Sequence, residues 1–265
     1  RHQMIRFEHV SFTHPTGTMA LNDIDLDIIP GNVLAIVGEN GAGKTTLIRH
    51  INGLIKPTSG KVIVFGTNTK ESSVAKLSRK VGIVFQNPNH QLFSESVEEE
   101  ITFALKNFKL NDNEITERVE DVLNYFGLMK YKNQSPMMLS GGEKKRLCLA
   151  IVQSWDPDVL ILDEPTVGQD LLQKQRLYEL IRGIIDKGNT VILVSHDIEF
   201  LWPLQPRVVV MAHGRIVADG TATSVFRNKD ALHRANVTNP QLLELSDKLG
   251  FEETNHFSDV ESAAK

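Results

Sequence analysis

The chain has 265 residues, of which 41% are hydrophobic and 23% are charged, and its formal net charge at pH 7 is −4. These values are ordinary for a water-soluble globular protein and argue against a nucleic-acid partner, which usually requires a basic surface. A single cysteine excludes an intrachain disulfide framework and favours a reducing compartment. No apolar run reaches the roughly 18 residues of a membrane-spanning helix, and no signal-peptide pattern is seen. Any membrane function is therefore expected to act through a partner.

Short strands are predicted at the start of the chain. Apolar residues alternate with aspartates over residues 24–28, which is the period of a half-exposed strand. The sequence HPTG at residues 14–17 is typical of a turn. Two more strand candidates follow at 62–65 and 81–85, and the second of them ends at Gln86.

The most specific local motif lies between residues 33 and 54. Five apolar residues predict a buried strand, GENGAGKT fits the pattern G-x-x-x-x-G-K-[ST], and apolar residues then recur at helical spacing. Glycines allow close approach of the backbone to a polyphosphate, and the helix N-terminus directs partial positive charge at it. Lys44 is placed to reach the β- and γ-phosphates, and Thr45 to bind Mg²⁺. The predicted nucleotide contacts in this motif are Gly38, Asn40, Gly41, Ala42, Gly43, Lys44, Thr45 and Thr46.

A helical segment interrupts the strands between residue 96 and about residue 138. Ser96 and Glu99 form a capping-box pattern before one amphipathic helix, and a second helix ends before Gly127. The acidic residues of the second helix are most simply a solvated face. With its flanking loops and the next helix, this segment predicts an inserted helical subdomain over about 87–155.

The sequence LSGGE at residues 139–143 opens the next helix. Its N-terminal amides and the Ser140 hydroxyl could receive an anion, although Ser140 and Glu143 also fit an ordinary capping box. The basic residues 144–146 could be a solvated cluster without further role. Cys148 has apolar neighbours and is expected to be a buried structural thiol.

Two later strands end in residues that suit phosphate chemistry. Residues 159–162 are apolar and lead to Asp163, which is expected to hold Mg²⁺, and to Glu164, which could polarise an attacking water. Residues 191–194 are also apolar and lead to His196. A histidine there is more often structural, but two phosphate-site strands that end in the same way favour a functional role.

The remainder of the chain predicts a hairpin and a last helix. Strands at 208–211 and 216–218 flank His213 and Gly214, and Pro240 begins a helix that contains regularly spaced leucines. The polar tail after Phe251 is expected to be loosely ordered.

These motifs, in this order, resemble the ATP-binding-cassette (ABC) ATPases over nearly the whole chain. The resemblance implies an α/β P-loop NTPase core within a domain at residues 1–251, with an N-terminal antiparallel β-subdomain and the inserted helical subdomain. Residues 221–265 would add a C-terminal helical extension and tail. The sequence FQNPNHQLF followed by SVEEEITFAL is similar to the energy-coupling-factor (ECF) transporter ATPases, which import metal ions or vitamins.

The resemblance also implies roles for single residues. The implied catalytic residues are Glu164, His196 and Gln86, and the implied Mg²⁺ ligands are Thr45, Gln86 and Asp163. In a head-to-tail dimer, the signature of one subunit would bind the ATP held by the other. The signature consists of Ser140, Gly141, Gly142 and Glu143, and the neighbouring D-loop ends at Asp170.

Two positions depart from the family pattern. His14 stands where many relatives have an adenine-stacking tyrosine, so base stacking could be weaker or shared with Phe12. The D-loop reads Gly168-Gln169-Asp170 instead of Gly-Leu-Asp. Because residue 169 should lie near the dimer interface, this departure leaves the choice between a homodimer and a heterodimer open.

ECF ATPases are peripheral proteins at the cytoplasmic face of the membrane, and they act with an integral coupling protein and a substrate-binding membrane subunit. Leu92, Phe93 and Glu98 are predicted to dock the coupling protein, with the acidic run 98–100 at the rim of a groove. Alternatively, Leu92 or Phe93 could be part of the core. A soluble cassette ATPase acting on ribosomes or DNA, and a nucleotide-binding scaffold without turnover, are the rival functions.

Overall fold

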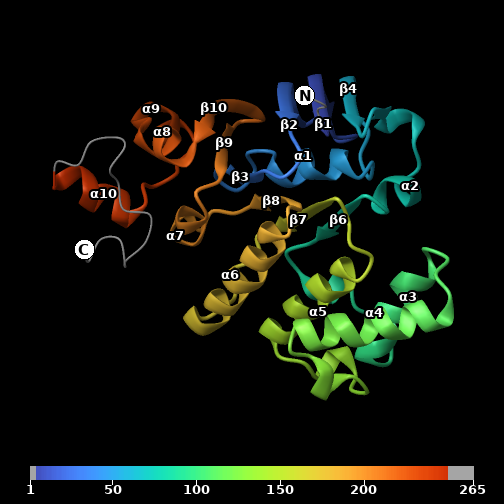
Figure 1. Cartoon of the computed structure of the whole chain (residues 1–265). Helices are drawn as coiled ribbons and strands as arrows, with labels where there is room; N and C mark the ends of the chain where they lie inside the picture. The colour runs from blue at the N-terminus through green and yellow to red at the C-terminus, as the bar shows by residue number, and fades with distance from the viewer. Residues whose placement is uncertain (1–3, 250–265) are drawn as a thin grey trace.

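The computed structural model describes residues 4–249, which form two β-sheets with helices packed around them (Figure 1). The strands are β1 (Ile5–Thr13), β2 (Met19–Ile28), β3 (Val33–Val37), β4 (Ser59–Val64), β5 (Thr67–Asn68), β6 (Val81–Val84), β7 (Val159–Asp163), β8 (Thr190–Val194), β9 (Arg207–Ala212) and β10 (Arg215–Thr221). The α-helices are α1 (Lys44–Ile51), α2 (Val74–Ser78), α3 (Val97–Lys106), α4 (Asp112–Tyr125), α5 (Gly141–Gln153), α6 (Leu171–Asp186), α7 (Ile198–Leu201), α8 (Ala222–Arg227), α9 (Lys229–Arg234) and α10 (Gln241–Lys248). Short 3₁₀ turns include Pro88–His90, Met129–Tyr131 and Pro136–Met138.

The larger sheet has the strand order β10-β9-β3-β8-β7-β6. Its strands from β9 to β6 are parallel, and β10 is added antiparallel to β9 through the predicted hairpin. Residues His213 and Gly214 both have positive φ, as a two-residue hairpin turn requires. The smaller sheet is antiparallel, with the order β2-β1-β4-β5, and it confirms the predicted N-terminal β-subdomain.

Two hydrophobic cores lie on opposite faces of the larger sheet. In β3, Leu34 and Ile36 belong to the core shared with α1 and the antiparallel sheet. The alternating residues Ala35 and Val37 belong to the core shared with helices α3 to α6. Burial of both faces explains why these strands appear in the sequence as continuous apolar runs. The α1 helix ends at Ile51, and the positive φ of nearby Gly53 fits the predicted helix stop.

Helices α3, α4 and α5 form the inserted helical segment, which lies below the sheets in Figure 1. The Ser96 side chain accepts a hydrogen bond from the Glu99 amide, as predicted. The reciprocal bond differs, because the Glu99 carboxylate accepts from the Glu95 amide instead of from Ser96. The capping box at Ser140 and Glu143 is complete, with both hydrogen bonds present. Cys148 is 1% exposed, which confirms the prediction of a buried thiol.

After β10 the chain forms α8, α9 and α10, which lie at the left of Figure 1. The sequence analysis predicted α10 but missed the two six-residue helices before it, because each is too short to show a helical period. Within residues 4–249, no helix has the length and apolar character needed to cross a membrane. The predicted polar tail lies outside the described residues.

Candidate active site

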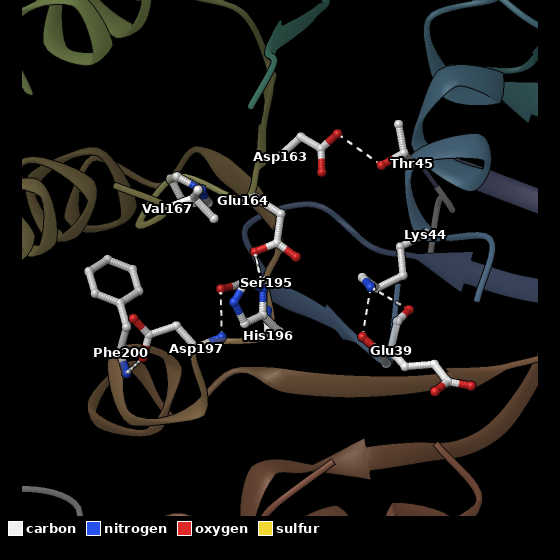
Figure 2. Close-up of polar contacts among 12 residues, drawn as sticks. Glu39, Lys44, Thr45, Asp163, Glu164, Val167, Ser195, His196, Asp197 and Phe200 are labelled. Carbon is white, nitrogen blue, oxygen red and sulfur yellow. Dashed lines mark hydrogen bonds and ion pairs between the residues drawn. The ribbon is translucent and has the colours of Figure 1, made fainter. Parts of the chain in front are cut away.

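Three neighbouring strands bring the predicted site residues to one edge of the parallel sheet. In space β8 lies between β3 and β7, although it follows both of them in the chain. The carboxyl ends of parallel strands share one edge, which is where such sheets bind ligands. The phosphate loop after β3, His196 after β8, and Asp163 and Glu164 at the end of β7 therefore meet there (Figure 2).

The glycines of the phosphate loop (residues 38–45) have structural roles that are visible in their surroundings. Gly38, Gly41 and Gly43 all have positive φ. A Cβ atom on Gly38 would lie 2.3 Å from the Met211 carbonyl oxygen, and one on Gly43 would lie 2.6 Å from the Ala20 carbonyl oxygen. Tight packing against the chain's own backbone thus requires both glycines. Gly43 precedes α1 without a side-chain cap, so the first amides of the helix can serve an anion.

Lys44 lies over this loop and is only 6% exposed. Its ammonium group donates hydrogen bonds to the carbonyl oxygens of Gly38, at 2.6 Å, and Glu39, at 2.9 Å (Figure 2). Burial lowers the pKa of Lys44, while the nearby carboxylates of Glu164 and Asp163 act in the opposite direction. The amine is therefore a buried cation beside the loop, which suits contact with phosphate oxygens.

Thr45 and Asp163 provide oxygen atoms that fit a magnesium ion. The Thr45 hydroxyl donates a hydrogen bond to Asp163 Oδ2 at 3.0 Å. Among the described residues, Asp163 Oδ1 is buried and has no hydrogen-bond partner. Burial raises the pKa of Asp163, so a cation at this position would compensate a desolvated carboxylate. Oxygen donors of this kind are the ligands that Mg²⁺ prefers.

Glu164 and His196 are in contact at the centre of the site. His196 Nδ1 lies 2.9 Å from Glu164 Oε2, and the Glu164 side chain is 8% exposed whereas that of His196 is 60% exposed. Within residues 4–249, Glu164 Oε1 is buried without a hydrogen-bond partner. Glu164 also has a φ of 49°, a left-handed conformation that is unusual for a residue with a side chain. Strain of this kind is common at functional sites.

Gln86 lines an open cavity of about 610 Å³ beside Glu164 and His196. The cavity is also lined by Asn40 from the phosphate loop and by Glu164 and His196. The structure thus places the three predicted catalytic residues around one space. Of the three predicted metal ligands, it brings Thr45 and Asp163 into contact, while Gln86 lies with Glu164 and His196.

The signature residues line a different space. Ser140, Gly142 and Glu143 border a small cavity of about 70 Å³ together with Gln169. The Glu143 carboxylate accepts hydrogen bonds from the Tyr131 hydroxyl, at 2.5 Å, and from the Ser140 amide, at 2.8 Å. The Tyr131 hydrogen bond is the main cause of the lowered pKa of Glu143. Glu143 thereby holds the first turn of α5, including Gly141, in place.

Asp170 and His14 occupy simple structural environments. Asp170 caps α6 in a complete capping box with Gln173. The His14 ring packs edge-on against Phe12 with a centroid distance of 5.0 Å, and Phe12 packs in the same way against His50. Phe12 is thus next to His14, as the shared-stacking hypothesis requires, and contact of His14 with a base remains a prediction.

The predicted docking segment divides into buried and exposed residues. Leu92 is 4% exposed and belongs to the helical core, which corrects its assignment to a docking surface. Phe93 is 66% exposed and packs edge-on against Phe103, with a centroid distance of 5.0 Å. Glu98 is partly exposed and pairs with Lys132. Glu100 is buried, so the acidic run does not form a continuous rim.

The buried Glu100 has a different role, which the sequence pattern concealed. Its carboxylate accepts hydrogen bonds from the amides of Phe93 and Ser94. These bonds fix the end of the loop that begins at Gln86. In the sequence, Glu100 occupies an inward-facing position of an amphipathic helix. Because a buried carboxylate requires hydrogen-bond donors, this position was the signal that could have indicated the role of Glu100.

Two lysines near the site were also missed. Lys174 on α6 donates a hydrogen bond to Asp197, next to His196, at 2.5 Å. Burial acts to raise the pKa of Asp197, but the hydrogen bonds from Lys174 and the Phe200 amide outweigh it and lower the pKa. Lys145 on α5 is half-buried and donates to the carbonyl oxygens of Pro165 and Val167. The interpretation of residues 144–146 as a merely solvated cluster was therefore wrong for Lys145.

Comparisons with known sequences identify the family. The sequence model of the ABC transporter family matches residues 21–167. The chain is 39% identical over 254 residues to the ECF transporter ATP-binding protein EcfA of Methanothermobacter thermautotrophicus, covering 94% of this chain and 82% of the relative. It is 39% identical over 259 residues to EcfA2 of Clostridium tetani, covering 95% and 90% of the two chains.

Solved structures agree with the sequence relatives. CbiO1 of Clostridium perfringens, described as part of the ABC transporter complex cbiONQ, has a TM-score of 0.79 and 35% identity, covering 94% of this chain and 99% of the other. The dimeric cassette MJ0796 bound to ADP and Pi has a TM-score of 0.74 and 26% identity, covering 82% and 98%. The chain therefore belongs to the ABC transporter family and is one of its ATPases, similar to the ATP-binding proteins of ECF transporters.

Proposed function

We propose that this chain is the ATP-hydrolysing subunit of an ECF-type importer that moves a metal ion or a vitamin across the membrane. The observation that carries the proposal is the meeting of Lys44, the Thr45–Asp163 pair and the Glu164–His196 pair at one sheet edge. The similarity to EcfA and CbiO1 supports the transport assignment. In this role the chain would be a peripheral protein at the cytoplasmic face of the membrane.

The chain would bind ATP through the phosphate loop and Lys44. The loop glycines bring backbone amides close to the phosphates, and α1 directs the positive end of its dipole towards them. Lys44 is already beside the loop carbonyls and would exchange those hydrogen bonds for charge-assisted ones to phosphate oxygens. His14 and Phe12 would receive the adenine.

Thr45 and Asp163 would hold Mg²⁺, with Gln86 as a further ligand from the cavity side. The ion would supply positive charge to the phosphate oxygens of ATP. Glu164 would orient the attacking water and accept its proton, because its carboxylate faces the cavity and has a free buried oxygen. His196 would hold Glu164 through Nδ1 and direct its exposed ring towards the γ-phosphate.

The second half of each ATP site would come from another cassette subunit. Gly141 and Gly142 at the start of α5 supply helix amides, and the local fold places Ser140 and Gly142 at a cavity separate from the phosphate loop. In a head-to-tail dimer, the signature residues 140–143 of one subunit would meet the phosphates held by its mate. Asp170 would lie near this interface. The mate could be a second copy or a related cassette.

The integral coupling protein would dock at the exposed aromatic pair formed by Phe93 and Phe103. Both rings are more than half exposed, and the loop that carries Phe93 begins at Gln86 beside the ATP-side cavity. An amphipathic helix with aromatic or aliphatic anchors would cover this pair. A substrate-binding membrane subunit would complete the transporter.

Purification of the chain from membranes, followed by mass analysis of the intact complex, tests the transport assignment. We expect a complex that contains an integral membrane coupling protein and two cassette subunits. A matched preparation of the Phe93→Ala variant is expected to lose the membrane protein while keeping the second cassette. Association with ribosomes or DNA, without any membrane protein, would instead support the rival soluble function.

A further inference from the structure

Lys145 connects helix α5 to the loop that follows β7, two elements that the proposed mechanism treats separately. It lies in the first half of α5, two residues after the signature residues 140–143, and its side chain crosses to that loop. There its ammonium group donates hydrogen bonds to the carbonyl oxygens of Pro165, at 3.1 Å, and Val167. Both acceptors lie within three residues of Glu164.

The loop that Lys145 contacts has a conformation that needs outside support. Glu164 has positive φ, a conformation that is unfavourable for a residue with a side chain. Within the loop, the Val167 amide donates to the Glu164 carbonyl at 3.3 Å, which is at the long end of the normal range. Because strained backbone persists only where its surroundings determine it, the two bonds from Lys145 help to fix the orientation of Glu164.

Lys145 also places positive charge near the Glu164 carboxylate. Burial lowers the pKa of Lys145, and Glu164 is the leading influence that raises it again. The two groups therefore interact electrostatically as well as through the loop backbone.

The same helix turn is packed against the D-loop. A Cβ atom on Gly142 would lie 2.7 Å from Gln173 Nε2 and 3.2 Å from Gln169 Oε1. Lys145 lines the small signature cavity together with these two glutamines. Any displacement of the signature turn therefore acts on the loop after Glu164 through direct contacts.

We propose that Lys145 is a positioning residue that joins the signature helix to the catalytic loop and holds Glu164 in its reactive orientation. This inference rests on the proposed role of Glu164 as the residue that activates water. The Lys145 ammonium group instead contacts the carbonyl oxygens of Pro165 and Val167, in the loop after Glu164. Its contribution acts on the rate of hydrolysis and not on nucleotide binding.

The test compares Lys145→Met, Lys145→Arg and Lys144→Met in the assembled ATPase. Lys145→Met is expected to lower kcat by between about tenfold and a hundredfold, the usual effect of a small misplacement of a reacting group. The dissociation constant for ATP is measured in proteins that also carry Glu164→Gln, which slows hydrolysis. In this background, Lys145→Met should change the dissociation constant less than about twofold. Lys145→Arg keeps a donor and the charge, so it should recover kcat to within about threefold of the parent.

Lys144→Met is the matched control, because it removes the same charge from the adjacent position. The Lys144 side chain donates an exposed hydrogen bond to Asn89, so its loss should change kcat less than about twofold. If Lys145→Met does not fold, Lys145→Leu provides a second side chain that cannot donate a hydrogen bond, for the same comparison with Lys145→Arg.

Normal kcat in a folded Lys145→Met or Lys145→Leu enzyme would overturn the inference. An equal loss in Lys145→Arg would also overturn it, since that result would indicate a packing role. Glu164→Gln is measured in parallel to separate the two proposals. If Glu164→Gln retains turnover, the role of Glu164 is wrong; if it blocks turnover while Lys145→Met does not, only the role of Lys145 is wrong.

Discussion

Glu164 and His196 are joined by two contacts to a single carboxylate oxygen. His196 Nδ1 lies 2.9 Å from Glu164 Oε2, and the His196 amide donates a hydrogen bond to the same oxygen at 3.3 Å. Because one oxygen is committed to His196, the other oxygen of Glu164 is left to face a ligand. In the proposed function, Nδ1 of His196 stays bound to Glu164 and its Nε2 atom would contact a phosphate oxygen.

The first prediction concerns Glu164. Glu164→Gln keeps the size of the side chain and its contact with the His196 amide but removes the basic oxygen. Hydrolysis should slow by at least about a hundredfold, the scale of a lost general base, while ATP binding should remain within about threefold of the parent. Single-turnover hydrolysis and equilibrium nucleotide binding measure the two effects, and near-normal turnover would show that Glu164 is not the base.

Lys44→Ala, unlike Glu164→Gln, should weaken the binding of ATP itself. Lys44 is a buried cation beside the phosphate loop, so its loss removes charge-assisted hydrogen bonds to the nucleotide. Affinity for ATP should fall by at least about tenfold, corresponding to about 1.4 kcal/mol. Isothermal titration with ATP measures the change, and Lys76→Ala on the exposed α2 is the control. Unchanged affinity would contradict the assigned role of Lys44.

Mixed dimers test whether Ser140 acts on the ATP bound by another subunit. In a dimer of two Lys44→Ala chains, or of two Ser140→Arg chains, both ATP sites carry a substitution. In a dimer of one chain of each kind, both substitutions fall in the same ATP site, and the other site is intact. ATPase activity should therefore rise above both parents on mixing. Absence of recovery, in preparations where mixed dimers are shown to form, would contradict shared sites. A natural heterodimer requires the same experiment with its own mate.

The docking prediction applies to the exposed Phe93 and no longer to the buried Leu92. Phe93→Ala, or charge reversal at Glu98, should reduce assembly with the membrane protein or uncouple transport, while the isolated subunit still folds and binds ATP. Phe93 gives the sharper test, because charge reversal at Glu98 also breaks its ion pair with Lys132. Co-purification and transport assays measure the result, and normal assembly and uptake in a folded double variant would exclude this surface.

Leu92→Ala is the contrasting control for this segment. Leu92 is buried in the helical core, so its truncation should lower the free energy of unfolding by about 2–5 kcal/mol. Phe93→Ala should leave that free energy within about 1 kcal/mol, as expected for exposed positions. Urea denaturation of the two isolated variants measures the difference.

Cys148 is predicted to be unreactive in the folded protein. Burial is the main cause that raises the pKa of its thiol to about 12, so almost no thiolate exists at pH 8. Iodoacetamide at pH 8 should leave the native protein unmodified and should alkylate Cys148 fully in urea. Mass spectrometry measures both states, and rapid alkylation of the native protein would show that this part of α5 opens in solution.

The sequence by itself determined most of the fold class and the chemistry of the site. The phosphate loop and the two acidic residues at the end of β7 were visible because each is encoded by consecutive residues. The helix start at Ser140 was also predictable, because its cap depends on residues only three positions apart. The hairpin at His213 and Gly214 likewise needs only local backbone preferences.

Only the tertiary structure decided which of these local features meet. Insertion of β8 between β3 and β7 places His196 against Glu164, and no spacing along the chain encodes that order. Tertiary packing also separated Leu92 from Phe93, and it buried Glu100 against the loop amides. Lys145 resembled any surface lysine in the sequence, because its partners are backbone carbonyls about 20 residues away. Contacts between distant backbone segments depend on the packing of whole elements, which a local pattern of residue types does not record.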